Sequence, residues 1–220
     1  MAIENLLSLQ PPTKIIDCKG TFCAIDLSVH NSLVAALVSP HDFDSYISEY
    51  KNKYNCAALY GGYNEKRNLY QQSDLFSGDA EDRDIHIGID LWVAAGTSVF
   101  AAADGVIHSF NYNAGIGNYG PTIILEHSHE GEKYFTLYGH LAMECIENIE
   151  IGDEVKKGTE IATLGDSSVN GNYPPHLHFQ IIKDIEGYFG DYPGVCSESQ
   201  KSKYLENCPD PNLLLKIKIS

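Results

Sequence analysis

Short apolar alternations separated by turn residues dominate the chain from Ile85 onward. In the stretch IHIGIDL the odd positions are apolar, whereas the even positions are His86, Gly88 and Asp90. The stretches SVFAAADGVIHSF, PTIILEH, KYFTLYGHL and HLHFQII are further short strand candidates, and GDEVKKGTEIATLGD is typical of a hairpin. Many short segments of period two, bounded by turn residues, predict strands. We therefore expect a mainly β fold, built as a twisted antiparallel sheet or a partly open barrel-sandwich.

The first 80 residues follow a different pattern. Residues 15–27 are typical of an extended start, and Ser39, followed by a proline, precedes apolar residues at helical spacing. A serine N-cap with proline at the first helical position predicts a helix over about residues 40–54. Residues 60–84 are rich in Gly, Asn, Asp and Tyr, which predicts a long connecting loop. We expect a small α/β N-terminal extension (1–80), a β domain (81–190) and a C-terminal tail (191–220).

Composition narrows the choice of partners. The 220 residues, 43% of them hydrophobic, suffice for one large domain with an extension. Thirty acidic residues against fifteen basic ones give a net charge of −15. Because nucleic-acid binding depends on cationic side chains that displace counterions, we expect no nucleic-acid partner, and no membrane partner either.

The cysteines and the N-terminus allow a prediction of the cellular compartment. No stretch has the pattern of a secretory signal or a membrane span, so we expect a cytoplasmic protein. The six cysteines are spread along the chain without a CxxC pair, and we expect them to be reduced thiols. Cys196 and Cys208 are the pair for which this argument against a disulfide is weakest.

Five polar residues stand opposite apolar strand positions and near glycine or proline. His86 and Asp90 share one predicted strand, His176 and His178 share another, and His140 ends a third. Imidazole nitrogens and carboxylate oxygens are ligands that suit zinc. The combination therefore predicts a zinc site. The other histidines lack this context, and we expect them to be surface or structural residues: His30, His41, His108, His127 and His129.

The same residues carry a resemblance to a known family. The HxxxD of His86 to Asp90, the YGHL around His140 and the HLHF of residues 176–179 resemble the lysostaphin-like zinc metallopeptidases, which include peptidoglycan endopeptidases. DLWVAAGTSVFAAADGVI and IGDEVKKGTEIATLGDS are similar to the family's glycine-bearing stretches, and the likeness spans about residues 83–183. NYGPTIILEH, PPHLHFQI and CPDPNLLL further resemble a subgroup fused to class III aminotransferases.

The resemblance implies a fold of the lysostaphin-like peptidase type and a division of labour among the five residues. It makes His86, Asp90 and His178 the ligands of Zn²⁺, and His140 and His176 the catalytic histidines, without ranking these two as general base. The implied activity is that of a zinc metalloendopeptidase, a hydrolase that cleaves small or muropeptide-like peptide substrates through a zinc-activated water.

Two alternatives stay open at this point. The first is a non-catalytic peptidase-like module that binds zinc or regulates another enzyme. The second is a biotinyl or lipoyl carrier, because the GDEVKKG turn is also typical of those β-sandwiches, although no methionine flanks Lys156 and Lys157. The sequence does not define the oligomeric state.

Overall fold

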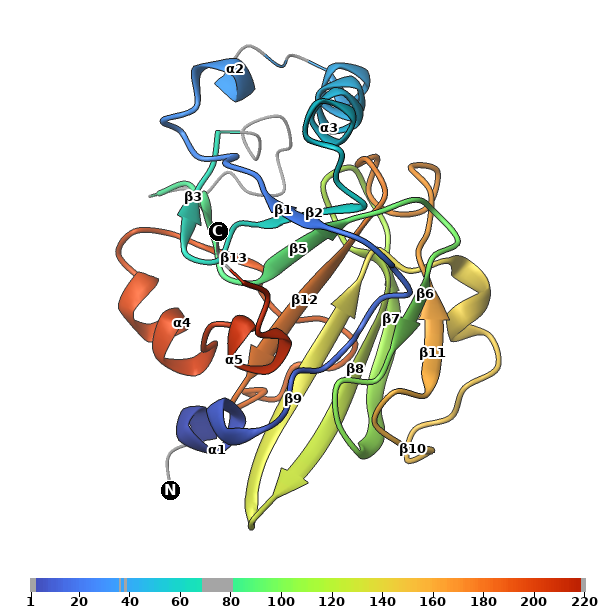
Figure 1. Cartoon of the computed structure of the whole chain (residues 1–220). Coiled ribbons are helices and arrows are strands. Elements are labelled where there is room, and N and C mark those ends of the chain that lie inside the picture. Colours follow the sequence, from blue (N-terminus) through green and yellow to red (C-terminus); the bar gives the residue numbers. More distant parts are fainter. Residues whose placement is uncertain (1–2, 36, 38, 69–80, 219–220) are drawn as a thin grey trace.

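An eight-stranded sheet forms the centre of the molecule in the computed structural model, which describes residues 3–35, 37, 39–68 and 81–218 (Figure 1). The strand order is β1-β2-β5-β12-β9-β8-β7-β10. Neighbouring strands are antiparallel except for the parallel pair β1 and β2. The predicted mainly β class with antiparallel sheets is confirmed, and among the described residues the sheet does not close into a barrel.

Two smaller sheets and several short helices complete the described structure. The strands of the central sheet are β1 (Phe22–Ala24), β2 (Ala58–Gly61), β5 (Ile89–Trp92), β7 (Gly105–Asn113), β8 (Gly120–His129), β9 (Glu132–Gly139), β10 (Glu154–Val155) and β12 (His176–Ile182). The smaller sheets pair β6 (Ser98–Phe100) with β11 (Glu160–Thr163), and β4 (Ile85–His86) with β3 (Glu65–Lys66) and β13 (Val195–Cys196). The helices are α1 (Ile3–Leu9), α2 (Ser32–Ala35), α3 (Pro40–Tyr54), α4 (Lys201–Asn207), α5 (Asn212–Leu215) and the 3₁₀ helix η3 (Met143–Ile146).

Helix α3 has the predicted bounds and cap. The Ser39 side chain accepts a hydrogen bond from the Asp42 amide at 3.1 Å, and Pro40 opens the first turn. The helix ends at Asn55, whose φ of 52° is left-handed. Its apolar side packs Ile47 into a core cluster with Leu59 of β2. The predicted N-terminal helix is therefore confirmed.

The predicted strand over IHIGIDL is wrong, because it is two strands in different sheets. His86 ends β4 in the small sheet, and Asp90 lies in β5 of the central sheet. Gly88 lies in the break, where the ring of His178 fills the space that a Cβ would need. The two polar residues consequently approach each other across a bend.

Two further predictions need correction. The stretch GDEVKKGTEIATLGD is not a hairpin, because β10 pairs with β7 and β11 pairs with β6. The predicted loop over residues 60–84 contains part of β2 and all of β3, which pairs with β4. Residues 69–80 of that predicted loop lie outside the described residues. Strand pairing with distant partners, which local composition does not encode, accounts for both differences.

Strand β12 is buried along its whole length and lies at the middle of the central sheet. Its odd side chains, Leu177, Phe179 and Ile181, join the main core, to which α1 and α5 also contribute. Its even side chains include His176 and His178 on the opposite face. Because both faces are covered, these polar groups need hydrogen-bond partners inside the protein.

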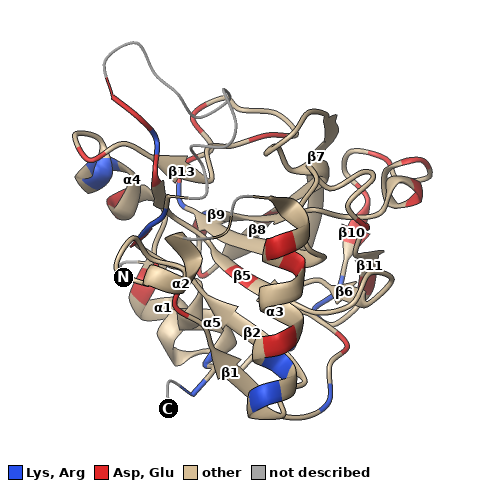
Figure 2. Ribbon diagram, turned by 90° about the horizontal axis from the view of Figure 1, so that it is seen from above, with Lys and Arg blue, Asp and Glu red and all other residues tan. Residues whose placement is uncertain are grey.

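Acidic residues lie on α3 and on the loops near β10 and β11, as seen from above in Figure 2. Their positions on exposed turns agree with a solvated acidic surface. In the described part of the chain, no helix combines the length and apolarity that crossing a bilayer requires.

The predicted set of reduced cysteines is wrong for one pair. Cys23 of β1 and Cys56, which follows α3, form a disulfide with a Cα–Cα distance of 5.9 Å. Parallel pairing of β1 with β2 brings Cys23 opposite Leu59, three residues after Cys56. Cys196 and Cys208, the pair for which the sequence argument against a disulfide was weakest, are both free and buried.

Opening this disulfide should destabilise the protein. The crosslink closes a loop with a sequence separation of 33 residues, and loop-closure entropy puts its contribution at about 3–4 kcal/mol. We expect the double variant Cys23→Ser/Cys56→Ser to lose about this much unfolding free energy in urea titrations. Cys18→Ser, at a free and half-buried cysteine, is the matched control. Equal midpoints for the double variant and the parent would contradict the crosslink.

Candidate metal centre

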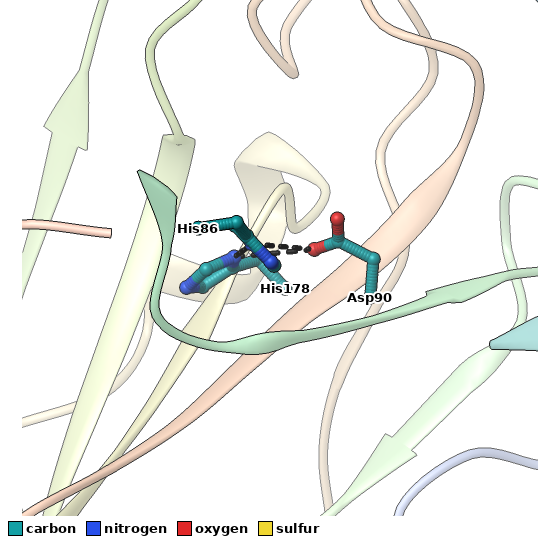
Figure 3. Close-up of side chains that lie close together, drawn as sticks. All are labelled: His86, Asp90 and His178. Carbon is teal, nitrogen blue, oxygen red and sulfur yellow. Dashed lines mark hydrogen bonds and ion pairs between the residues drawn. The ribbon is translucent and has the colours of Figure 1, made fainter. Parts of the chain in front are cut away.

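Three strands bring one donor atom each to a common point (Figure 3). His86 comes from β4, Asp90 from β5 and His178 from β12. The His86 Nε2 lies 2.9 Å from the His178 Nδ1, and the Asp90 Oδ1 lies 3.3 Å and 3.2 Å from these two nitrogens. All three side chains are buried. The three predicted metal ligands thus converge.

The remaining nitrogen of each ring has its own partner, which fixes the tautomer. His86 donates from Nδ1 to the Gly62 carbonyl oxygen at 2.9 Å. His178 donates from Nε2 to the Gln180 amide oxygen at 3.0 Å, and the Tyr119 hydroxyl lies 3.4 Å from the same nitrogen. Because a neutral imidazole has one donor and one acceptor, the nitrogens facing Asp90 present lone pairs. This is the arrangement of outer hydrogen bonds that ligating histidines have in metal sites.

The charges around the three donors favour the forms that bind a cation. Burial lowers the pKa of His86 to about 4, against the opposing effect of Asp90, so the ring is neutral near pH 7. Burial alone would raise the pKa of Asp90, but His86 and the Arg67 guanidinium outweigh it and hold this pKa well below its usual value. A neutral His86 imidazole and an ionised Asp90 carboxylate result.

The donor set fits zinc in chemistry and spacing. Zinc takes nitrogen and oxygen ligands at about 2.0–2.1 Å in tetrahedral geometry, which separates neighbouring ligand atoms by about 3.3 Å. The separations of 2.9–3.3 Å among the three donor atoms are close to that edge length. Three protein ligands also leave one tetrahedral position open, as catalytic zinc sites require.

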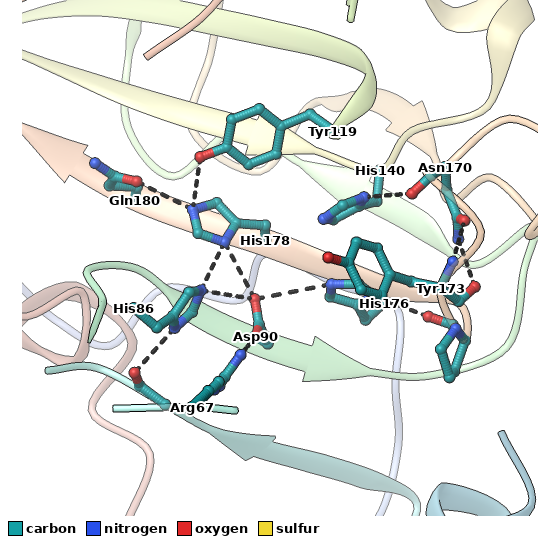
Figure 4. Close-up of polar contacts among 12 residues, drawn as sticks. Arg67, His86, Asp90, Tyr119, His140, Asn170, Tyr173, His176, His178 and Gln180 are labelled. Carbon is teal, nitrogen blue, oxygen red and sulfur yellow. Dashed lines mark hydrogen bonds and ion pairs between the residues drawn. The ribbon is translucent and has the colours of Figure 1, made fainter. Parts of the chain in front are cut away.

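His140 and His176 lie beside this group with their rings 4.1 Å apart (Figure 4). His140 donates from Nδ1 to the Asn170 carbonyl oxygen, and His176 donates from Nδ1 to the Pro174 carbonyl oxygen, both at 2.8 Å. Burial, with the neighbouring histidines, keeps the pKa of His140 well below its usual value, and burial also lowers that of His176. Both rings are therefore neutral, with a basic Nε2.

The backbone at His140 differs from the sequence expectation. His140 does not continue the strand but follows the last residue of β9, and its φ of 63° is left-handed. Such a conformation costs free energy for a residue with a Cβ and recurs at functional sites. His140 remains in place because its amide donates to the Tyr119 carbonyl oxygen at 2.8 Å.

All five predicted residues line one cavity of about 220 Å³. Tyr119 and Tyr173 also line it, and their rings pack against His140 with centroids 5.6 Å and 5.5 Å away. Neither tyrosine stands out in the sequence. By contrast, Tyr138 is fully buried and its hydroxyl accepts a hydrogen bond from the Ala102 amide, so it is a packing residue.

Arg67 is the functional candidate that the sequence did not reveal. Its Nη1 donates to the Asp90 Oδ2 at 2.7 Å, opposite the oxygen that faces the histidines. The side chain is buried, although Arg67 lies in the N-terminal extension, where no catalytic spacing is visible. Of the histidines outside the site, His127 is a structural residue, buried between the Asp104 carbonyl and the Thr136 hydroxyl.

Comparison with known proteins places the site within a family segment. Residues 84–188 match the model of peptidase family M23. All five site residues fall in this segment, which is therefore similar in sequence to M23 peptidases.

Two curated relatives illustrate the match. An uncharacterized metalloprotease of Haemophilus influenzae is 37% identical over 95 residues, which are 43% of this chain and 18% of the relative. The peptidoglycan DD-endopeptidase ShyC of Vibrio cholerae is 37% identical over 98 residues, 44% of this chain and 20% of the relative. The matched region therefore spans about a fifth of the length of these relatives.

Solved structures are similar as well. The catalytic domain of lysostaphin from Staphylococcus simulans matches with a TM-score of 0.43 and 24% identity, over 73% of this chain and 97% of that chain. The catalytic domain of the M23 protein EnpA from Enterococcus faecalis gives a TM-score of 0.41 and 22% identity, over 61% and 88% of the two chains.

A methyl group at position 88 should disrupt the centre. A Cβ there would lie 2.5 Å from the His178 Cε1 and 3.0 Å from the Phe179 carbonyl oxygen, so the imidazole must move. We expect Gly88→Ala to lose stoichiometric zinc after dialysis, measured by elemental analysis. Gly152→Ala is the control for backbone strain alone, because alanine is strained at its φ of 91° while the added methyl meets nothing within 4 Å. Full zinc retention by Gly88→Ala would show that the position of His178 does not matter for the metal.

Proposed function

We propose that the protein is a zinc-dependent metallopeptidase, a hydrolase that cleaves peptide bonds in small or muropeptide-like substrates. The observation that carries this proposal is the convergence of His86, Asp90 and His178 beside two neutral histidines in one cavity. When bound, zinc would supply Lewis-acid polarisation of the scissile carbonyl and activation of a water molecule.

The residues of this chain would carry out the proton transfers. His140 and His176 each keep Nδ1–H on a backbone carbonyl oxygen, so that Nε2 is the atom that accepts a proton from the attacking water. Once protonated, the same atom can donate a hydrogen bond to the oxyanion or a proton to the leaving amine. Either histidine can serve as the base, and the other is then placed to stabilise negative charge.

The names of the relatives support the proposed substrate class. They describe a peptidoglycan DD-endopeptidase and a DD-carboxypeptidase/endopeptidase. We propose a small or muropeptide-like peptide as the substrate, with no nucleic-acid partner. The finer resemblance to the subgroup fused to aminotransferases stays a prediction, as does the division into residues 1–80, 81–190 and 191–220.

Variants should separate metal binding from proton transfer. We expect His140→Ala to keep its zinc and fold while turnover falls by about 10²–10⁴-fold, the usual contribution of a positioned acid or base. We expect Asp90→Asn to lose zinc and activity together. The measurements are zinc content, circular dichroism and release of amino groups from a panel of glycine-rich and D-amino-acid peptides.

His30→Ala, at an exposed histidine outside the site, is the matched control and should behave like the parent. Parental turnover by His140→Ala would remove His140 from the catalytic set. A parent protein with full zinc that cleaves nothing in the panel would favour the non-catalytic, zinc-binding or regulatory module. A parent protein that binds no zinc would refute the proposal.

A cytoplasmic location stays a prediction. The Cys23–Cys56 disulfide is typical of an oxidising compartment, where such bonds persist. Cell fractionation, combined with thiol labelling of the recovered protein, distinguishes a reduced cytoplasmic form from an exported, crosslinked form.

A further inference from the structure

The segment from Gly62 to Arg67, which contains β3, contacts two of the three proposed ligands. The Gly62 carbonyl oxygen accepts the Nδ1 proton of His86, and Arg67 donates to Asp90. A Cβ at Gly62 would lie 1.7 Å from the Arg67 Nη2 and 2.9 Å from the His86 Nδ1. The backbone of this segment therefore approaches both residues too closely for any side chain at position 62.

Arg67 is itself fixed on several sides. Its amide donates to the Asp84 carbonyl oxygen, which extends the β3–β4 ladder next to His86. Its Nε donates to the Glu65 Oε1 at 2.6 Å, and the other oxygen of Glu65 accepts the Leu27 amide at 3.2 Å. The guanidinium thus joins two carboxylates through two nitrogens held at a fixed spacing in one plane, which the single nitrogen of a lysine ammonium does not reproduce.

Trp92 lies between the Arg67 guanidinium and His176, one of the two proposed catalytic histidines. The Arg67 Cζ lies 5.8 Å from the Trp92 ring, and that ring stacks on His176 at 5.6 Å with planes 20° apart. The chain has two arginines among its fifteen basic residues, Arg67 and Arg83, and both line the cavity.

We propose that Arg67 is a positioning residue that holds the Asp90 Oδ2 away from the metal, so that only Oδ1 serves as a ligand. This inference rests on the proposed function and extends it to the N-terminal segment. The two oxygens of Asp90 have different partners. Oδ2 accepts a hydrogen bond from Arg67 at 2.7 Å, whereas Oδ1 lies 3.2–3.3 Å from the two histidines. Without Arg67, a buried charged oxygen would lose its donor, and the metal would be its nearest replacement.

Zinc affinity alone does not test this role. Removing the guanidinium removes a positive charge that repels a cation, whereas freeing the carboxylate loosens the site, so the two effects oppose each other. The number of ligands is the better readout. Cobalt(II) replaces zinc in such sites, and its visible absorption is intense in four-coordinate sites and weak at higher coordination numbers.

The experiment loads the metal-free protein with cobalt(II) and compares the parent with Arg67→Met. We expect intense visible bands in the parent and their loss in Arg67→Met, because Asp90 then binds through both oxygens. Lys66→Met is the matched control, since Lys66 is adjacent, exposed and paired with Asp84 away from the site. It should keep the parental bands.

The outcomes separate this inference from the proposed function. Parental bands in Arg67→Met overturn the role of Arg67 and leave the metallopeptidase proposal intact. A parent that takes up neither cobalt nor zinc overturns both. If circular dichroism shows that Arg67→Met does not fold, the same cobalt measurement is made on Arg67→Lys. Weakened bands in Arg67→Lys support the role of Arg67, because one lysine nitrogen does not reproduce the contacts of two guanidinium nitrogens with two carboxylates. Parental bands overturn it.

Discussion

The buried carboxylate of Asp90 is the constraint on which the site depends. An ionised group removed from water is tolerated only where charges and donors replace its hydration. Arg67 supplies the positive charge at Oδ2, and His86 and His178 face Oδ1. Arg67 directly follows β3, His86 lies in β4 of the same small sheet, and His178 lies in β12 of the central sheet. The partners therefore come from two sheets and from distant parts of the chain. The N-terminal segment must therefore fold with the β domain for the carboxylate to be satisfied.

Two glycines make this convergence possible. Gly88 lets the chain bend between β4 and β5 and leaves room for the ring of His178. Gly62, with a left-handed φ of 102°, brings a backbone carbonyl to His86 beside the Arg67 guanidinium. In both cases the missing side chain is what allows a polar group of another strand to approach. The dense hydrogen bonding of the centre thus depends on backbone positions that carry no chemistry themselves.

Sequence reasoning succeeded where the relevant information is local. Period-two alternation identified β12 and placed its two histidines on one face, and the Ser39 cap located α3. The five residues that were singled out also line one cavity, although His86 and Asp90 lie on two strands where one was expected.

Sequence reasoning failed where a feature depends on pairing between distant segments. Arg67 reaches the site only because β3 lies beside β4, with Glu65 opposite His86. The Cys23–Cys56 crosslink likewise depends on the parallel pairing of β1 and β2, and the break at Gly88 depends on the ring of His178. No spacing in one sequence encodes these contacts, since each is set by which strands become neighbours.

The backbone also assigns different tasks to chemically identical side chains. His176 and His178 stand two residues apart on one face of β12, yet His178 turns Nδ1 toward Asp90 whereas the Nδ1 of His176 is tied to the Pro174 carbonyl oxygen. The Nδ1 of His140 is tied in the same way to Asn170, and its ring lies 4.1 Å from that of His176. Two imidazoles this close repel each other when both are charged, so the pair takes up one proton far more readily than two. The two carbonyl oxygens that hold the rings thus produce a pair that would suit the proposed hydrolysis, in which one imidazole accepts a proton beside a neutral neighbour.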